Sequence, residues 1–211
     1  METVNAAWIL LPVSAYLLGS VPWGLVVARR CKAVDIRKVG SGNIGATNVR
    51  RIAGPVPGAV TLAVDVLKGA LPVYVAAVVC GSNSSWCSLF LALVAFSAFM
   101  GHLFPLFLKF KSGGKGVATA AGCLIALSPM TALIGGLVFV LVACWSNHVS
   151  AGSLAASAVA PFAVWVDTSS PVMVGYCVLT GLWIFRRHRE NIQRLRAGTE
   201  AVIRGESQTK S

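Results

Sequence analysis

Residues 40–51, GSGNIGATNVRR, form a polar stretch in a chain that is otherwise mostly apolar. Glycine has no Cβ, so Gly40, Gly42 and Gly45 allow positive φ angles and a close approach of the backbone to a ligand. Successive backbone N–H groups in such a loop form a concavity that binds anions. The stretch is therefore predicted to bind a phosphate or acyl-phosphate group. Further donors are the side chains of Ser41, Asn43, Thr47, Asn48, Arg50 and Arg51.

The same stretch matches G-x-G-x-x-G, the pattern of dinucleotide-binding folds. That interpretation requires a preceding strand within a βαβ unit. Here residues 29–39 are a basic segment after a long apolar run, and the next acidic residue, Asp65, lies inside another apolar run. We therefore reject a dinucleotide site. A glycine-rich turn without a ligand remains the alternative, although a plain turn requires neither two asparagines nor paired arginines.

The composition is that of an integral membrane protein. The chain has 211 residues, of which 56% are hydrophobic and 12% charged, and its mean hydropathy is +0.75. Soluble domains carry about a quarter charged residues. A formal charge of +11 would suggest nucleic acid as a partner of a soluble protein. Because no soluble domain is predicted here, we predict no nucleic acid binding. The N-terminus carries Glu2 and no basic n-region, so we predict no cleavable signal peptide.

The six cysteines lie mostly within apolar runs and show no CxxC or Cys/His spacing. We interpret them as small buried hydrophobic residues, and we predict no metal site and no cofactor. Cys80 and Cys87 flank one short loop and could pair if that loop faces an oxidising compartment. The sequence leaves this pairing open.

Apolar runs long enough to cross a bilayer as helices recur along the chain. The run 117–145 is divided at Ser128-Pro129, because the residue before a proline disfavours helix. We predict an all-α membrane protein with about seven spans, one of them short, in a single domain over residues 1–211. A helix from Arg186 onward is predicted to leave the membrane. The predicted spans are 8–28, 58–80, 86–108, 117–127, 130–145, 151–166 and 171–185, joined by loops at 29–54, 81–85, 109–116, 147–150 and 167–170.

Lysine and arginine are confined to three segments, 29–51, 109–115 and the tail from residue 186, with Lys68 as the exception. Cytoplasmic loops carry an excess of these residues. Crossings at the predicted spans place all three basic segments on one face, with the C-terminus in the cytosol and the N-terminus outside. A single crossing over 117–145 would put the basic tail outside, which contradicts this rule.

The second basic loop, residues 109–116, reads KFKSGGKG and places Lys115 among Gly113, Gly114 and Gly116. A helix predicted to begin near residue 117 would direct its N–H groups and positive dipole end at this lysine. We predict a second anion site here. The alternative is that the lysines only set the topology, which suffices for Lys109 and Lys111 but does not explain the glycines.

Two pairs of polar residues have helical i, i+3 spacing. His188 and Asn191 would share a helix face and could contact a polar substrate. A passive interfacial histidine is the alternative. Asp65 and Lys68 lie inside a predicted span, where an unpaired charge costs about 3 kcal/mol. We predict that they pair with each other or line a polar cavity, and that they support the structure more than the chemistry.

The motifs GSGNIGATNVRR (40–51), GHLFPLFLKFKSGGKGVAT (101–119) and HRENIQRLRAGTE (188–200) occur in this order over nearly the whole chain. This set resembles the bacterial acyl-phosphate:glycerol-3-phosphate acyltransferase family (PlsY). The resemblance implies a multi-pass protein of the bacterial plasma (inner) membrane with its active site facing the cytosol. It implies transfer of a fatty acyl group from acyl phosphate to glycerol 3-phosphate, giving lysophosphatidate and phosphate, the first acylation of phospholipid biosynthesis. The implied partners are these two substrates, membrane lipid and a soluble enzyme that produces acyl phosphate.

The resemblance also implies roles for individual residues. Ser41 and Arg51 would act in the first motif, Lys115 with its glycines would bind glycerol 3-phosphate, and His188 and Asn191 would contribute from the third. The segment SAGSLAAS (150–157) resembles a further polar element of the family, although Asn147-His148 stand where the family has an Arg-Tyr pair. The predicted catalytic residues are Ser41, Arg51, His188 and Asn191, and the predicted substrate-binding residues are Gly42, Asn43, Gly45, Thr47, Asn48, Gly113, Gly114, Lys115, Gly116, Ser150 and Ser153.

Two other functions were weighed. The soluble-type glycerolipid acyltransferase signature, histidine followed five residues later by aspartate, is absent, since those positions after the three histidines hold Phe107, Ser153 and Gln193. A transporter for a small phosphorylated anion would also suit Lys115 at a short helix, because broken helices build such sites. No internal repeat is evident, and the candidate residues fall on one predicted face. Enzyme activity is therefore favoured over transport.

Overall fold

The structure is a computed structural model that describes residues 6–32, 35–81, 85–111 and 113–204. The described residues are helical and contain no strand, which confirms the all-α prediction. The chain divides into two compact units, Met1–Leu127 and Ser128–Ser211. Each unit is described separately below, and the single domain over residues 1–211 stays a prediction.

The N-terminal unit begins with two helices, α1 (Ala7–Ser20) and α2 (Trp23–Lys32), where one helix over 8–28 was predicted. The break occurs at Val21, which has extended backbone angles (φ −66°, ψ 118°). The following Pro22 disfavours the helical conformation at the residue before it and supplies no N–H. Helix α2 also runs through Lys32, four residues beyond the predicted end of the span.

A short helix, α3 (Ala46–Ala53), lies inside the segment that was predicted to be a loop. Its Val49 and Ala53 are buried against α2, while Arg50 and Arg51 in its last turn are exposed. Eight residues are too few for hydropathy to mark a helix, and α3 is stable here because its apolar face packs on a neighbouring helix. The buried cluster consists of Leu25, Ala28, Ile36, Ile44, Val49 and Ala53.

Three further elements complete this unit with the predicted character. Helix α4 (Pro55–Cys80) and helix α5 (Ser85–Leu103) follow the apolar runs, and α5 is continued by a 3₁₀ turn, η1 (Leu106–Leu108). Helix α6 (Val117–Leu127) has the predicted bounds. Ser112 and residues 82–84, which fall in predicted loops, lie outside the described residues.

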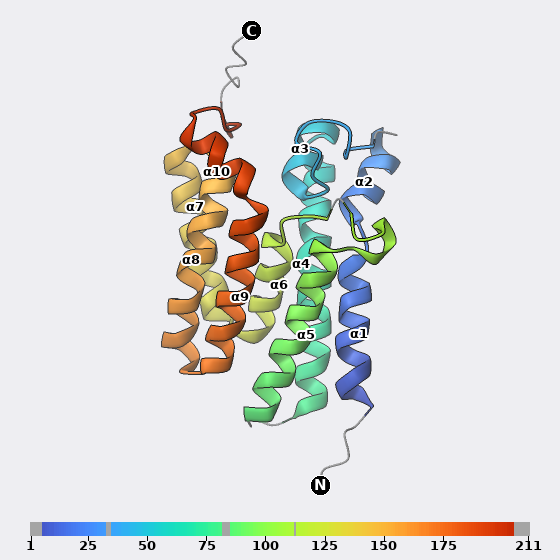
Figure 1. The fold of residues 1–211 in the computed structure, drawn as a ribbon, viewed down its shortest axis with the longest axis vertical. Coiled ribbons are helices and arrows are strands. Elements are labelled where there is room, and N and C mark those ends of the chain that lie inside the picture. The colour runs from blue at the N-terminus through green and yellow to red at the C-terminus, as the bar shows by residue number, and fades with distance from the viewer. Residues whose placement is uncertain (1–5, 33–34, 82–84, 112, 205–211) are drawn as a thin grey trace. The chain divides into compact units, whose positions relative to one another are not determined.

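These helices approach each other closely at small residues. A Cβ on Gly101 of α5 would overlap the Tyr16 carbonyl of α1, and a Cβ on Gly122 of α6 would overlap the Val66 carbonyl of α4. Apolar lipid provides little hydrophobic driving force between helices, so such contacts hold membrane helices together through van der Waals packing. Helices α1, α4 and α5 lie side by side in Figure 1.

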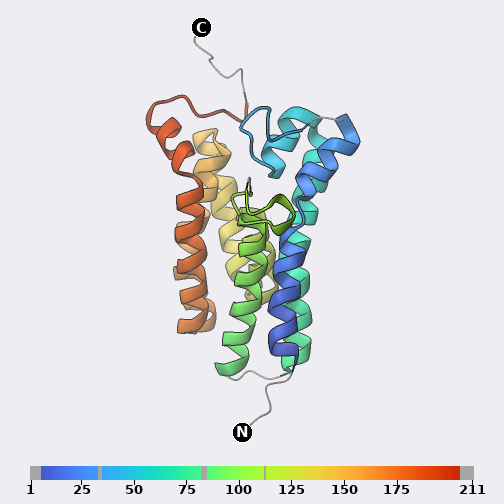
Figure 2. The same ribbon diagram turned by 45° about the vertical axis from the view of Figure 1, so that its right-hand side comes forward.

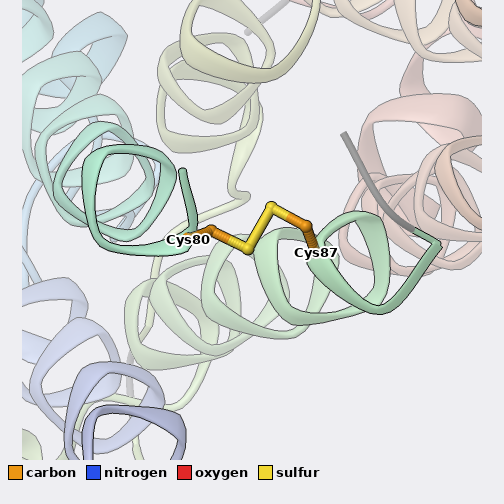
Figure 3. The surroundings of a disulfide bond; sticks show 2 residues. All are labelled: Cys80 and Cys87. Carbon is orange, nitrogen blue, oxygen red and sulfur yellow. A yellow bond between two sulfur atoms is a disulfide. The ribbon is translucent and has the colours of Figure 1, made fainter. Parts of the chain in front are cut away.

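The structure answers the question that the sequence left open about two cysteines. Cys80 at the end of α4 and Cys87 in the first turn of α5 form a disulfide, with Cα atoms 5.9 Å apart (Figure 3). The disulfide lies at the end of the N-terminal unit opposite α3 (Figure 1). Of the remaining cysteines, Cys31 at the end of α2 is exposed and has a free thiol.

The C-terminal unit contains α7 (Pro129–Ser146), α8 (Val149–Thr168), α9 (Pro171–Arg187) and α10 (Arg189–Arg196). The predicted break at Ser128-Pro129 is confirmed, with the Ser128 hydroxyl accepting a hydrogen bond from Thr131 N. The predicted loop 147–150 is only a turn, because α8 begins at Val149. His188 separates α9 from α10, so the predicted tail helix begins three residues later than expected.

Within the part of the chain that the structure describes, five helical segments are long and apolar enough to cross a membrane: Ala7–Lys32, Pro55–Cys80, Trp86–Leu108, Pro129–Ser146 and Val149–Thr168. Helix α6 is apolar but shorter, and α9 has 17 residues and ends in two arginines. The count of about seven spans therefore stays a prediction.

Candidate active site

The first glycine-rich loop is held closed by one buried side chain, Asn48 of α3, which is 2% exposed. Its amide nitrogen donates to the carbonyls of Ile36 (3.1 Å), Val39 (3.3 Å) and Asn43 (2.9 Å). Its amide oxygen accepts from the backbone N–H of Ser41 at 3.0 Å. A loop of this kind has no ladder partners for its backbone, so the asparagine supplies them.

The three glycines of this loop have different roles. Gly40 (φ +63°) and Gly42 (φ +66°) have the predicted left-handed conformation. The prediction is wrong for Gly45, which is extended (φ −79°, ψ 163°) and forms the N-cap of α3. Gly45 N donates to Asn43 Oδ1 at 2.8 Å, so the asparagine fixes the turn that enters the helix.

The remaining donors of the first motif lie on the outside of this framework. Ser41 and Arg51 are exposed, and Thr47 is half-buried in the first turn of α3. The geometry thus divides the predicted residues into two groups. Asn48 shapes the loop from within, whereas Ser41 and Arg51 are accessible to a ligand.

The nearby carboxylate, Asp35, is engaged by two arginines. Its oxygens accept from Arg37 Nε at 2.9 Å and from the Arg37 guanidinium at 2.6 Å, and Arg29 lies 3.8 Å away. The Arg37 hydrogen bonds hold the pKa of Asp35 well below its usual range. Asp35 is therefore a poor general base at neutral pH.

The second glycine-rich loop lies directly on the last turn of α5. Gly114 N donates to the His102 carbonyl at 3.1 Å, and a Cβ on Gly114 would overlap the His102 imidazole. A Cβ on Gly116 (φ +87°) would overlap the Phe99 ring. The glycines are thus required by close packing, as well as by any approach to a ligand.

Lys115 occupies a half-buried position between these glycines. Helix α6 begins two residues later, and its first internal hydrogen bond runs from Ala120 N to the Gly116 carbonyl at 2.8 Å. The predicted arrangement of a lysine beside a helix N-terminus is confirmed. Both glycine-rich loops of the N-terminal unit lie at the end away from the disulfide (Figures 1 and 2).

In the C-terminal unit, the Glu200 carboxylate accepts hydrogen bonds from two predicted site residues and from one arginine. Its Oε1 accepts from Ser150 Oγ (2.8 Å) and Asn191 Nδ2 (2.6 Å), and its Oε2 accepts from Arg194 Nε (2.8 Å). Burial acts to raise the pKa of Glu200, but the hydrogen bonds from Arg194, Asn191 and Ser150 outweigh it and lower the pKa. Glu200 is the last residue of the third motif (188–200), and no role was predicted for it from the sequence.

His188 and Asn191 are both buried, at 3% and 6% exposure. His188 caps α9 and precedes α10, and its Nδ1 lies 2.8 Å from the Ile184 carbonyl. A carbonyl can only accept, so this contact assigns the Nδ1 proton and places the lone pair of a neutral ring on Nε2. The amide of Asn191 is oriented by Glu200.

The first turn of α8 contains both predicted serines. Ser150 donates to Glu200, as described, while Ser153 Oγ donates to the Val149 carbonyl at 2.9 Å. Ser153 is therefore not part of the Glu200 cluster. Substrate binding by the two serines stays a prediction.

Asn147 and His148, where this chain departs from the family pattern, hold the segment after Glu200. Asn147 is left-handed (φ 61°), and its side chain exchanges two hydrogen bonds with the backbone of Arg204, at 2.8 and 3.0 Å. Its carbonyl accepts from Ile203 N at 2.9 Å. His148 Nδ1 lies 3.4 Å from the Ala201 carbonyl.

Comparisons with known proteins agree on one family. The sequence model described as Glycerol-3-phosphate acyltransferase matches residues 9–198. A glycerol-3-phosphate acyltransferase of Geobacter metallireducens is 49% identical over 192 residues, covering 91% of this chain and 95% of that protein. One of Syntrophotalea carbinolica is 44% identical over 188 residues, covering 89% and 93%.

Two solved structures are similar throughout. One is the crystal structure of PlsY (YgiH), an integral membrane glycerol 3-phosphate acyltransferase, in its glycerol 3-phosphate form. It has a TM-score of 0.88 and 39% identity, and the match covers 94% of this chain and 96% of that chain. The lysophosphatidic acid form has a TM-score of 0.84 and 38% identity, covering 93% and 95%.

The geometry of the first loop gives a prediction about Asn48. Asn48→Asp removes the amide donor to three carbonyls, at a cost of about 1–3 kcal/mol for each buried group left unsatisfied. We expect amide hydrogen exchange across residues 36–45 to accelerate at least about tenfold. Asn43→Asp is the matched control, because the bond from Gly45 needs only an acceptor and should keep its protection. Equal exchange in Asn48→Asp and the unmodified protein would contradict the role of Asn48.

Proposed function

The chain belongs to the glycerol-3-phosphate acyltransferase family, and on this premise we propose how its residues carry the reaction. The protein is an integral membrane enzyme of phospholipid synthesis that acylates glycerol 3-phosphate to lysophosphatidate. The family membership decides against the transporter interpretation. We propose acyl phosphate as the acyl donor.

One observation carries the proposal: the N-terminal unit has two separate glycine-rich loops at the same end (Figure 2). Each has a cationic side chain that is not fully buried: Arg51 in α3, which follows the first loop, and Lys115 within the second. A reaction between acyl phosphate and glycerol 3-phosphate requires sites for two phosphate groups. Two loops of this type match that requirement.

We assign the first loop to the acyl phosphate. The Ser41 hydroxyl and the Asn43 N–H would donate to its phosphate, with Thr47 beside them, while the N–H groups of Gly42 and Gly45 hold the loop through the Val39 carbonyl and Asn43 Oδ1. Arg51 would neutralise the phosphate as it becomes the leaving group, which stabilises charge that develops in the transition state.

We assign the second loop to glycerol 3-phosphate. Lys115 would pair with its phosphate, and the N–H groups at the start of α6 would add donors and a favourable dipole. Because this phosphate is remote from the reacting hydroxyl, binding here also positions the hydroxyl.

The chemical step is a direct transfer. The hydroxyl oxygen of glycerol 3-phosphate attacks the acyl carbonyl carbon, the bond from that carbon to the phosphate oxygen breaks, and the electron pair leaves with the phosphate. The hydroxyl proton passes to His188 Nε2 or to the departing phosphate. The Nδ1 contact of His188 with the Ile184 carbonyl supports the first choice, because it places the lone pair of a neutral ring on Nε2. Asn191, held by Glu200, would orient the acceptor together with Ser150 and Ser153.

Ser41 is proposed as a hydrogen-bond donor and not as a nucleophile. Acyl phosphate is already an activated mixed anhydride, so a covalent acyl-enzyme intermediate offers little advantage. Asp35, the carboxylate nearest in sequence, is bound to Arg37 and has a lowered pKa, which makes it unsuited to activating a serine.

We propose that the protein lies in the inner membrane of a bacterium and that both glycine-rich loops face the cytosol. The basic segments support this orientation through the positive-inside rule. The disulfide supports it independently, because disulfides persist in oxidising compartments and this one lies at the end away from the loops. A soluble enzyme that produces acyl phosphate would then deliver it from the cytosol.

The first prediction of this scheme concerns Lys115. Lys115→Ala removes a charge-assisted hydrogen bond to phosphate, worth about 2–3 kcal/mol, so KM for glycerol 3-phosphate should rise by about 30- to 150-fold. KM for acyl phosphate should change much less in steady-state assays. Lys111→Ala, in the same loop and exposed, is the control and should stay close to the unmodified enzyme. An unchanged KM for glycerol 3-phosphate in Lys115→Ala would remove the assignment.

The second concerns the order of events. We expect intersecting double-reciprocal plots and no burst of phosphate when glycerol 3-phosphate is omitted. Ser41→Ala should lower the rate by about 10²-fold through loss of one donor. Intact-mass analysis after incubation with acyl phosphate alone should find no acylated protein. Parallel plots, together with an acyl adduct that Ser41→Ala abolishes, would establish a covalent mechanism instead.

The third uses the native cysteines to test the orientation. In intact cells, an impermeant maleimide should label Cys80 and Cys87 only after treatment with an impermeant reductant, because the proposed orientation places their disulfide outside the cytosol. Cys31 should be labelled only after the cells are opened. Peptide mapping by mass spectrometry distinguishes the sites. Labelling of Cys31 in intact cells would reverse the proposed orientation.

A further inference from the structure

Three buried polar residues lie beneath the second loop and take no part in the proposed mechanism. Asp65 and Lys68 of α4 and His102 of α5 are 2%, 3% and 4% exposed. A charged residue in a membrane helix costs about 3 kcal/mol, and such residues are found where they pair or serve a function. The pairing of Asp65 with Lys68 was predicted from the sequence, whereas the place of His102 was not.

The three side chains form a connected chain of contacts. Lys68 Nζ lies 2.9 Å from Asp65 Oδ1 and donates to the Val21 carbonyl at 3.1 Å. Val21 is the residue at which α1 and α2 separate. His102 Nδ1 lies 3.7 Å from the same Asp65 oxygen. The cluster therefore ties α4 and the break between α1 and α2 to the last turn of α5.

The other side of the His102 ring meets the second loop. The His102 carbonyl accepts from Gly114 N at 3.1 Å, and the imidazole edge at Nε2 occupies the place that a Cβ on Gly114 would take. Gly114 does not have a left-handed φ. The requirement for glycine at this position comes from the His102 ring and not from the backbone conformation.

We propose that His102 is a positioning residue, which sets the second loop against the Asp65–Lys68 pair and thereby places Lys115 for glycerol 3-phosphate. This inference rests on the proposed function of that loop. Lys115 follows Gly114 directly and lies two residues before the start of α6, so a shift of Gly114 moves both the ammonium group and the neighbouring N–H donors. Displacement of about 1 Å in such a group can lower a rate by 10²-fold.

A buried histidine that merely fills space is the alternative, and two variants separate it from positioning. His102→Leu keeps the bulk and loses both ring nitrogens. His102→Asn keeps a polar nitrogen near the Nδ1 position that faces Asp65. For a positioning role we expect KM for glycerol 3-phosphate to rise by about tenfold in His102→Leu and by less in His102→Asn, with KM for acyl phosphate within about twofold. A space-filling role predicts the opposite order or equal changes in both KM values.

A double-mutant cycle between His102 and Gly114 tests the contact itself. Gly114→Ala alone should raise KM for glycerol 3-phosphate by at least about tenfold, because the new methyl group meets the ring. His102→Ala alone should raise that KM by about tenfold, and the double variant should stay near tenfold instead of reaching the roughly hundredfold product, because removing the ring also removes the obstacle. Ser97→Ala, on an exposed face of α5, is the control and should not alter the Gly114→Ala defect. Effects of Gly114→Ala and His102→Ala that simply multiply would overturn the proposal.

Amide hydrogen exchange tests the role of His102 independently of the proposed function, because it needs no substrate. It can also be measured on variants whose activity is too low to assay. In the full-length protein without substrate, His102→Asn and His102→Leu should accelerate exchange at residues 114–116 by at least about tenfold, while the interior of α6 keeps its protection. Unchanged exchange at residues 114–116 in both variants would overturn the positioning role. If the effect is present but Lys115→Ala leaves KM for glycerol 3-phosphate unchanged, the assignment of the loop to that substrate fails and the role of His102 in holding the loop stands.

Discussion

The side-chain amide of Asn48 is the interaction on which the exposed donors of the N-terminal unit depend. A glycine-rich loop has high conformational entropy and no regular backbone partners, so it would not hold Ser41 and Arg51 in one place by itself. The buried amide satisfies carbonyls on both sides of the loop and the Ser41 N–H. Its donors are directed inward, which leaves the outer donors to face the ligand.

In the C-terminal unit, Glu200 has the same holding role as Asn48 in the N-terminal unit. It holds its neighbours by accepting hydrogen bonds, whereas Asn48 mainly donates them. A buried carboxylate is stable there only because Arg194, Asn191 and Ser150 donate to it. Asp35 is neutralised in the same manner by Arg37. Both carboxylates hold other residues and are poor proton acceptors, which is why the proposed proton transfer relies on His188 or on the phosphate itself.

Membrane helices must be held together without a strong hydrophobic driving force. In the N-terminal unit, two kinds of contact between helices do this. Glycines such as Gly101 and Gly122 permit backbone contact between helices. The Asp65–Lys68 pair adds a polar connection that reaches Val21 on one side and His102 on the other. The second glycine-rich loop packs on His102, so the contacts between the helices continue directly to a proposed substrate site.

The sequence by itself determined the features that depend on local pattern. Hydropathy marked the helices, the Ser128-Pro129 pair marked a break, and the i, i+3 spacing paired Asp65 with Lys68, because each depends on neighbours a few residues apart. Tertiary structure alone decided the features that depend on distant partners. These are the stability of α3 on α2, the contact of His102 with Gly114, the disulfide, and the bond between Ser150 and Glu200, which are fifty residues apart. A hydrogen bond or a steric contact depends on distance in space. The spacing of two residues in the sequence does not predict that distance when the residues are far apart along the chain.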